Sequence, residues 1–138
     1  MADLNHVRIE DIEQVSGFFE KVSLRKAASG IDLSAFGMSI VEMGPGADEY
    51  PEHDHSPDGL GGRMFEKRPD QLGQEEVYVA LRGSGTLEAE GERYPLDPEH
   101  IVRVGPGVTR HVTAGPDGLR LLAIGATPGE PYGAGETG

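Results

Sequence analysis

The chain has 138 residues, which is enough for one domain with a hydrophobic core and short for two. It contains no cysteine, so disulfides, iron–sulfur clusters and thiol nucleophiles are excluded, and any metal must be held by nitrogen and oxygen atoms. The net charge of −12 argues against nucleic-acid binding, which needs clustered positive charge. With no membrane-length apolar run and no signal-peptide pattern, we expect a soluble, cytoplasmic protein without a membrane partner.

Residues 1–18 form an N-terminal segment that holds the best candidate helix of the sequence. Ile9, Ile12 and Val15 recur at a spacing of three residues, which predicts a short helix over residues 9–19. The rest of the chain has little helical character.

Short apolar stretches separated by turns dominate the chain after the N-terminal segment, and glycine and proline are frequent between them. This pattern is typical of an all-β sandwich or barrel with antiparallel strands. The stretches predicted as strands are residues 18–28, 35–43, 49–55, 75–81, 85–90, 92–96, 100–104, 109–113 and 119–125.

Two segments lie outside this strand pattern. Residues 56–73 form a loop that is long for a compact domain, and such loops are commonly functional. Residues 127–138 lack the apolar area needed for stable packing and are predicted as a flexible C-terminal tail. The sequence therefore predicts one β-barrel domain over residues 19–126, with the loop 56–73 inserted in it.

Histidines and a carboxylate at the ends of predicted strands indicate a metal site. His53 and His55 are two residues apart in an extended stretch, so their imidazoles project from the same face. Glu75 and Glu76 begin an apolar strand, where an inward carboxylate must be paired or bound to metal. His111 follows a glycine-rich turn, and three imidazoles with one carboxylate form a complete ligand set for a divalent ion.

These residues resemble two motifs of the cupin superfamily, specifically of small single-domain conserved-barrel cupins. The first motif pairs His-x-His with a glutamate and a glycine, here His53, His55, Glu76 and Gly83; the second is centred on Pro-x-Gly-x-x-His. Pro106, Gly107 and His111 carry the second motif, although Val108 stands where the family often has glycine. The similarity spans residues 36–125 and is interrupted by the long loop between His55 and Glu76.

The resemblance implies a double-stranded β-helix, or jelly-roll barrel, that holds one divalent metal ion. The implied ligands are His53, His55, Glu76 and His111, and the family register selects Glu76 rather than Glu75. These ligand types suit manganese, iron, nickel or zinc without deciding among them. Glu75 and Tyr78 are candidate general bases, and the sequence assigns a catalytic role to neither.

Cupins of this kind include dioxygenases, isomerases and decarboxylases, and the fold does not choose among these reactions. The first hypothesis is therefore a small metalloenzyme that acts on a small polar organic molecule. The alternative is a non-catalytic module that binds a small molecule or sugar, and a third possibility is a barrel that has lost its metal.

Strand alternation and loop composition add expectations about partners. If Glu76, Tyr78 and Ala80 face the barrel interior, the apolar residues at 77, 79 and 81 face outward and need cover, which predicts a homodimer unless N-terminal strands cover them. Cations at positions 63, 67 and 68 of the inserted loop suggest a lid for an anionic substrate. His100, in a turn, is expected to be satisfied within that turn.

Overall fold

The computed structural model describes residues 3–15, 19–51 and 73–129. Its strands form one antiparallel sheet in the order β1-β2-β3-β7-β4-β5, and β6 pairs with β4 beside this path. The elements are η1 (Ile9–Asp11), β1 (Gln14–Val15), β2 (Val22–Arg25), α1 (Ala27–Gly30), β3 (Gly37–Met43), β4 (Glu75–Ala89), β5 (Glu92–Leu96), β6 (Ile101–Val104) and β7 (Arg110–Ala126).

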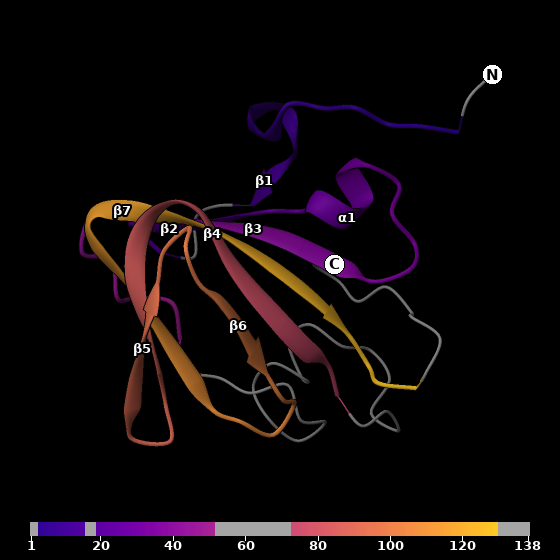
Figure 1. Ribbon diagram of the computed structural model, residues 1–138. Coiled ribbons are helices and arrows are strands. Elements are labelled where there is room, and N and C mark those ends of the chain that lie inside the picture. The colour runs from indigo at the N-terminus through magenta and orange to yellow at the C-terminus, as the bar shows by residue number, and fades with distance from the viewer. Residues whose placement is uncertain (1–2, 16–18, 52–72, 130–138) are drawn as a thin grey trace.

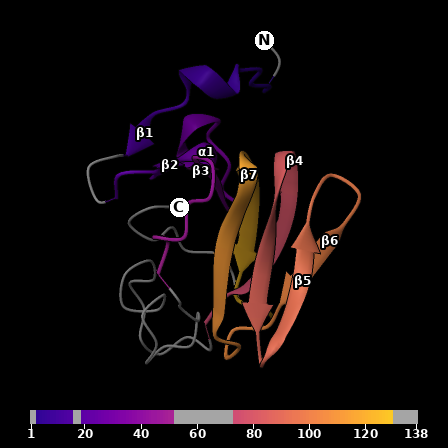
Figure 2. The ribbon, with the colours of Figure 1, turned by 90° about the vertical axis from the view of Figure 1, so that its left-hand side faces the viewer.

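The two longest strands, β4 and β7, pair with each other along most of their lengths and curve strongly (Figures 1 and 2). Each of them joins two stretches that the sequence predicts as separate strands: 75–81 with 85–90, and 109–113 with 119–125. Bulges between Ala80 and Gly85 bend the pair without ending it. The curvature brings both ends of the sheet around a common interior, which gives the predicted all-β jelly roll.

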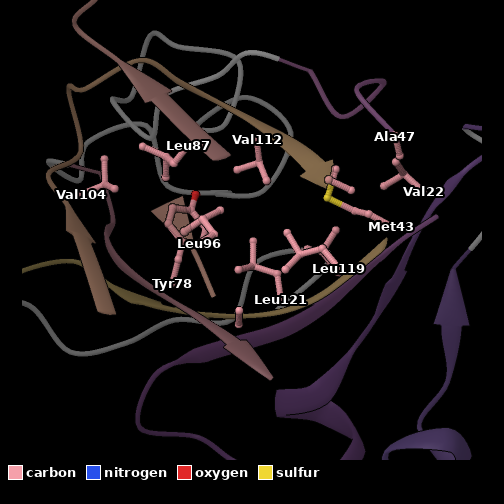
Figure 3. Packing of buried hydrophobic residues seen from close by; sticks show 13 residues of the cluster. Val22, Met43, Ala47, Tyr78, Leu87, Leu96, Val104, Val112, Leu119 and Leu121 are labelled. Atoms are coloured by element: carbon pink, nitrogen blue, oxygen red, sulfur yellow. The ribbon is translucent and has the colours of Figure 1, made fainter. Parts of the chain in front are cut away.

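The interior of the barrel is filled by alternate residues of the curved strands, as strand geometry requires. On β4 these are Glu76, Tyr78 and Ala80, which confirms the predicted inward register. The apolar core cluster consists of Val22, Val41, Met43, Ala47, Tyr78, Ala80, Leu87, Leu96, Val104, Val112, Ala114, Leu119 and Leu121 (Figure 3).

The N-terminal segment and α1 cover the outer face of the sheet over β3 and β7 (Figure 1). Ile12 and Ala27 pack there against Ile40, in a second and smaller core. The predicted helix over residues 9–19 is wrong, because the described residues 9–15 form a single 3-10 turn and Val15 then pairs with Leu24 at the sheet edge. The backbone of this segment thus gains hydrogen bonds from the sheet in place of those of a helix.

Two further differences from the predicted elements concern segment ends. The stretch 18–28 forms strand only over Val22–Arg25, and its alanines begin the short helix α1. Residues 49–51 are not in a strand, and residues 52–55 lie outside the described part of the chain. No helix within the described ranges is long and apolar enough to cross a membrane.

Candidate functional site

A cluster of polar side chains is buried inside the barrel among the apolar core residues. Glu76 and Tyr78 come from the start of β4, and Arg110 is the first residue of β7. The Tyr78 hydroxyl donates a hydrogen bond to Oε1 of Glu76 at 2.5 Å, and Nη2 of Arg110 donates to the same oxygen at 3.2 Å. All three residues are buried, and Arg110 has no exposed surface.

Arg110 is held in place by further contacts within the barrel. Its Nη1 donates to the carbonyl oxygen of Val108 at 2.6 Å, and its Nε donates to the Tyr78 hydroxyl at 3.3 Å. The guanidinium carbon lies 6.0 Å from the centre of the Tyr78 ring, which is within range of a cation–π interaction. The guanidinium is therefore fixed by several groups besides Glu76.

Strand alternation explains which of the two adjacent glutamates enters the barrel. Glu76 shares the inner face of β4 with Tyr78, whereas Glu75 points outward and accepts a hydrogen bond from Arg103 of β6. The predicted choice of Glu76 as the inward carboxylate is confirmed by this arrangement. Glu75 lies on the opposite face from the interior cluster, so it is not positioned to act as a base there.

The tyrosines near Glu76 are held in their protonated form. Burial raises the pKa of Tyr78 well above its ordinary value, the negative charge of Glu76 raises it further, and Arg110 opposes both effects only in part. Burial and the charge of Glu76 also raise the pKa of Tyr50. Tyr78 is thus a hydrogen-bond donor to Glu76 at neutral pH and not a general base.

His111 projects from the face of β7 opposite to Arg110. Arg110, Val112 and Ala114 are buried in the barrel, whereas His111 is half-buried and pairs in register with Glu88. The Nε2 atom of His111 lies 3.0 Å from the carbonyl oxygen of Asp48. The structure therefore brings Glu76 together with Arg110 rather than with His111.

The other predicted ligands, His53 and His55, lie outside the described residues, as do the cations at positions 63, 67 and 68 of the predicted lid. Within the described ranges, no group of three or more histidines and carboxylates could hold a metal ion. Glu76 and His111 are too few by themselves to form such a group. A metal centre in this barrel therefore depends on His53 and His55.

Arg110 is the site residue that sequence reasoning missed. A one-residue shift of the second motif would have placed Arg110 on the motif histidine. Strand alternation gives the same answer, since the apolar Val112 and Ala114 predict an inward Arg110 and an outward His111. His100, by contrast, behaves as expected, with its Nδ1 atom 2.8 Å from the Asp97 carboxylate in an exposed turn.

A pocket of about 620 Å³ lies on the outside of the barrel, between β2 and the bulged part of β4. Glu42 and Arg120 form part of its wall and pair with each other, and Arg120 also pairs with Glu10 of the N-terminal segment. The remaining charged side chains at the pocket are of both signs, including Lys21, Arg82 and Asp117. This mixed lining does not select a ligand of one charge.

The described strands form an all-β jelly roll, and solved cupin structures have the same fold. A cupin-superfamily sugar phosphate isomerase from Silicibacter pomeroyi DSS-3 aligns over 90% of this chain and 77% of its own, at 18% identity and a TM-score of 0.66. A cupin protein from Bacteroides fragilis aligns over 99% of this chain and 95% of its own, at 20% identity and a TM-score of 0.62.

A predicted oxalate decarboxylase from Thermotoga maritima is also similar, over 89% of this chain and 99% of its own, at 18% identity and a TM-score of 0.63. Identities at this level show a shared fold. Neither a protein-family model nor a curated protein matches the sequence.

Proposed function

We propose that this chain is a metal-binding cupin enzyme that acts on a small polar organic molecule inside its barrel. The observation that carries the proposal is the buried cluster of Glu76, Tyr78 and Arg110. A buried ion pair often contributes no more stability than apolar residues of similar volume, so the fold alone gives little reason for it. A few convergent polar groups within an apolar cavity wall are typical of ligand sites.

The similar structures support an isomerase or a decarboxylase as the type of enzyme, since they include a sugar phosphate isomerase and a predicted oxalate decarboxylase. A dioxygenase is the third reaction type in the proposal. A polar cluster inside a barrel can orient a small polar substrate for any of these reactions.

The proposed metal ligands are His53, His55, Glu76 and His111, and the proposed ion is manganese, iron, nickel or zinc. A divalent ion there would polarise a carbonyl group of the substrate. Tyr78 would orient the Glu76 carboxylate through a hydrogen bond from its hydroxyl, and Arg110 would supply a positive charge beside that carboxylate. For His111 to join this set, its imidazole would have to leave the Asp48 carbonyl oxygen.

A second candidate function is non-catalytic binding of a small molecule. It is favoured by the protonated state of Tyr78 and by the outward position of Glu75, because neither residue then serves as a general base. Substrate screening of the metal-loaded protein against small acids and sugars would separate the two functions. Turnover of any of these compounds supports the enzyme, and binding without turnover supports the module.

Elemental analysis of purified full-length variants tests the metal proposal. We expect about one equivalent of metal in the wild type. The metal content of His53→Ala and of Glu76→Ala should be at least about tenfold lower, because each substitution removes a proposed ligand. His100→Ala is the matched control, since this histidine is exposed and bonds to Asp97. His111→Ala tests the fourth ligand by itself.

Two results would contradict the metal site. One is wild-type protein with less than about a tenth of an equivalent of any transition metal when purified without chelator. The other is a metal content that stays the same in both His53→Ala and Glu76→Ala.

A further inference from the structure

The ion pair inside the barrel differs in geometry from the ion pair on its outer face. Outside, Arg120 and Glu42 use two nitrogens and two oxygens, with Nε 2.7 Å from Oε1 and Nη2 2.9 Å from Oε2. Inside, Arg110 and Glu76 contact each other through one nitrogen and one oxygen at 3.2 Å. Two-point pairing is the stronger arrangement for a guanidinium and a carboxylate, so the interior pair is not optimised as a structural ion pair.

The orientation of Arg110 depends on groups that would remain in place if Glu76 were exchanged for another anion. The carbonyl oxygen of Val108 accepts from Nη1, and the Tyr78 hydroxyl accepts from Nε. Glu76 contacts the Nη2 end of the fork. A guanidinium held in this way is preorganised to receive an oxyanion.

We propose that Arg110 is the anion-binding residue of the barrel and that its ligand carries a carboxylate or a phosphate group. This inference rests on the proposed function insofar as it takes the barrel interior as the ligand site. The oxyanion replaces Glu76 as the partner of Nη2, so the buried guanidinium remains neutralised in both states. Glu76 keeps the hydrogen bond from the Tyr78 hydroxyl after the exchange.

The exchange predicts that Glu76 weakens anion binding. In the wild type, the incoming oxyanion competes with the Glu76 carboxylate for Arg110 and is repelled by it. Glu76→Gln removes the competing charge and keeps an oxygen that can accept from Tyr78.

The test is calorimetric titration of the purified full-length chain with malonate and, separately, with inorganic phosphate. Malonamide serves as the uncharged analogue of malonate. The proteins are the wild type, Glu76→Gln, the double variant Glu76→Gln/Arg110→Gln, and Arg103→Gln as a control on an exposed arginine of the outer face. The double variant removes both charges of the pair, whereas Arg110→Gln alone would leave Glu76 without its cation; thermal melting checks that each variant folds.

We expect Glu76→Gln to bind at least one of the two anions about tenfold more tightly than the wild type, and the double variant to lose that binding. Arg103→Gln should match the wild type, and malonamide should not bind. The affinities for malonate and for phosphate, compared with each other, show which oxyanion the site prefers. The inference is overturned if Glu76→Gln binds neither anion more tightly than the wild type, or if the double variant binds as Glu76→Gln does.

Because Glu76→Gln also lacks a proposed metal ligand, the metal content of each protein is measured and the anion affinities are compared at that content. Tighter anion binding by Glu76→Gln in a protein whose wild type holds no metal would overturn the metal site and support the role of Arg110. If the wild type holds metal and Glu76→Gln binds neither anion more tightly, the metal site is supported and the role of Arg110 is overturned.

Discussion

Two buried arginines, Arg25 and Arg110, lie on opposite faces of the same sheet, and each is neutralised by a glutamate. Arg25 is 7% exposed and donates to Glu42 on the outer face, and it also donates to the carbonyl oxygen of Ile12. Its contacts tie the N-terminal segment to β3. The hydrogen bonds of Arg110 to Glu76, Tyr78 and Val108 instead converge on the interior, which fits a role inside the barrel.

Glu42 is the residue on which the outer network depends, because it accepts hydrogen bonds from both Arg25 and Arg120. We expect Glu42→Gln to lower the free energy of unfolding at pH 7 by about 1–3 kcal/mol, since Arg25 and Arg120 each lose one of two carboxylate partners and keep only Glu10. Chemical denaturation of both proteins measures this difference. A change below about 0.5 kcal/mol would mean that the network adds little to stability.

The effect of Glu42→Gln on stability should depend on pH. Burial alone would raise the pKa of Glu42, but hydrogen bonds from Arg120 and Arg25 outweigh burial and lower it. A carboxyl group whose folded pKa is lowered stabilises the fold above its ordinary value of 4.5, and this stability is lost as the pH falls through the folded pKa. The stability gap between the wild type and Glu42→Gln should therefore narrow below pH 4.5, and a constant gap would contradict this.

At the scale of the elements, the bulge in β4 decides how the barrel curves. Gly83 lies there with φ of +80°, and a Cβ atom on it would stand 2.2 Å from the carbonyl oxygen of Gly118 on β7. Glycine is therefore required both by the backbone conformation and by the close approach of the two strands.

A pair of alanine substitutions separates these two requirements. Gly91 has φ of +79°, and a Cβ atom on it would meet no atom of the described residues within 4 Å, so Gly91→Ala should cost only about 1 kcal/mol. Gly83→Ala carries the same conformational cost plus the clash with Gly118 and should cost at least about 2 kcal/mol more. Thermal or urea unfolding of both variants gives the comparison, and equal destabilisation would show that the strands separate easily.

At the scale of the whole molecule, the described residues cover the outer face of the sheet only in part. The N-terminal segment packs over Ile40 and its neighbours on β3 and β7. Leu81 is still 40% exposed and Ile101 is 75% exposed, where β6 pairs with β4. A homodimer through this face therefore remains a proposal.

Light scattering coupled to size exclusion tests the dimer. We expect the wild type to elute as a dimer and Ile101→Glu to elute as a monomer at the same concentration, because a charge cannot be buried at an apolar contact without a partner. Leu4→Glu is the control, since Leu4 is 73% exposed on the N-terminal segment. A wild-type monomer, or a dimer that persists in Ile101→Glu, would rule out this interface.

The sequence by itself determined the all-β barrel and the inward position of Glu76. The barrel follows from local rules, since turn residues delimit strands. The period of two puts Glu75 and Glu76 on opposite faces, and the resemblance to the family motif selects Glu76 as the inward one. The same rule applied to residues 110–114 would have placed Arg110 inside and His111 outside. The resemblance to a histidine motif obscured this, because the motif can be aligned in two registers one residue apart.

Only the tertiary structure decided what Glu76 contacts and how the N-terminal segment folds. Glu76 and Arg110 are 34 residues apart, and it is the curvature of β4 and β7 that brings them together inside the barrel. Likewise, the spacing of Ile9 and Ile12 fits a helix, but pairing with the free edge of β2 supplies the hydrogen bonds that a short helix would lack. Contacts between distant segments outweigh local preference at both places.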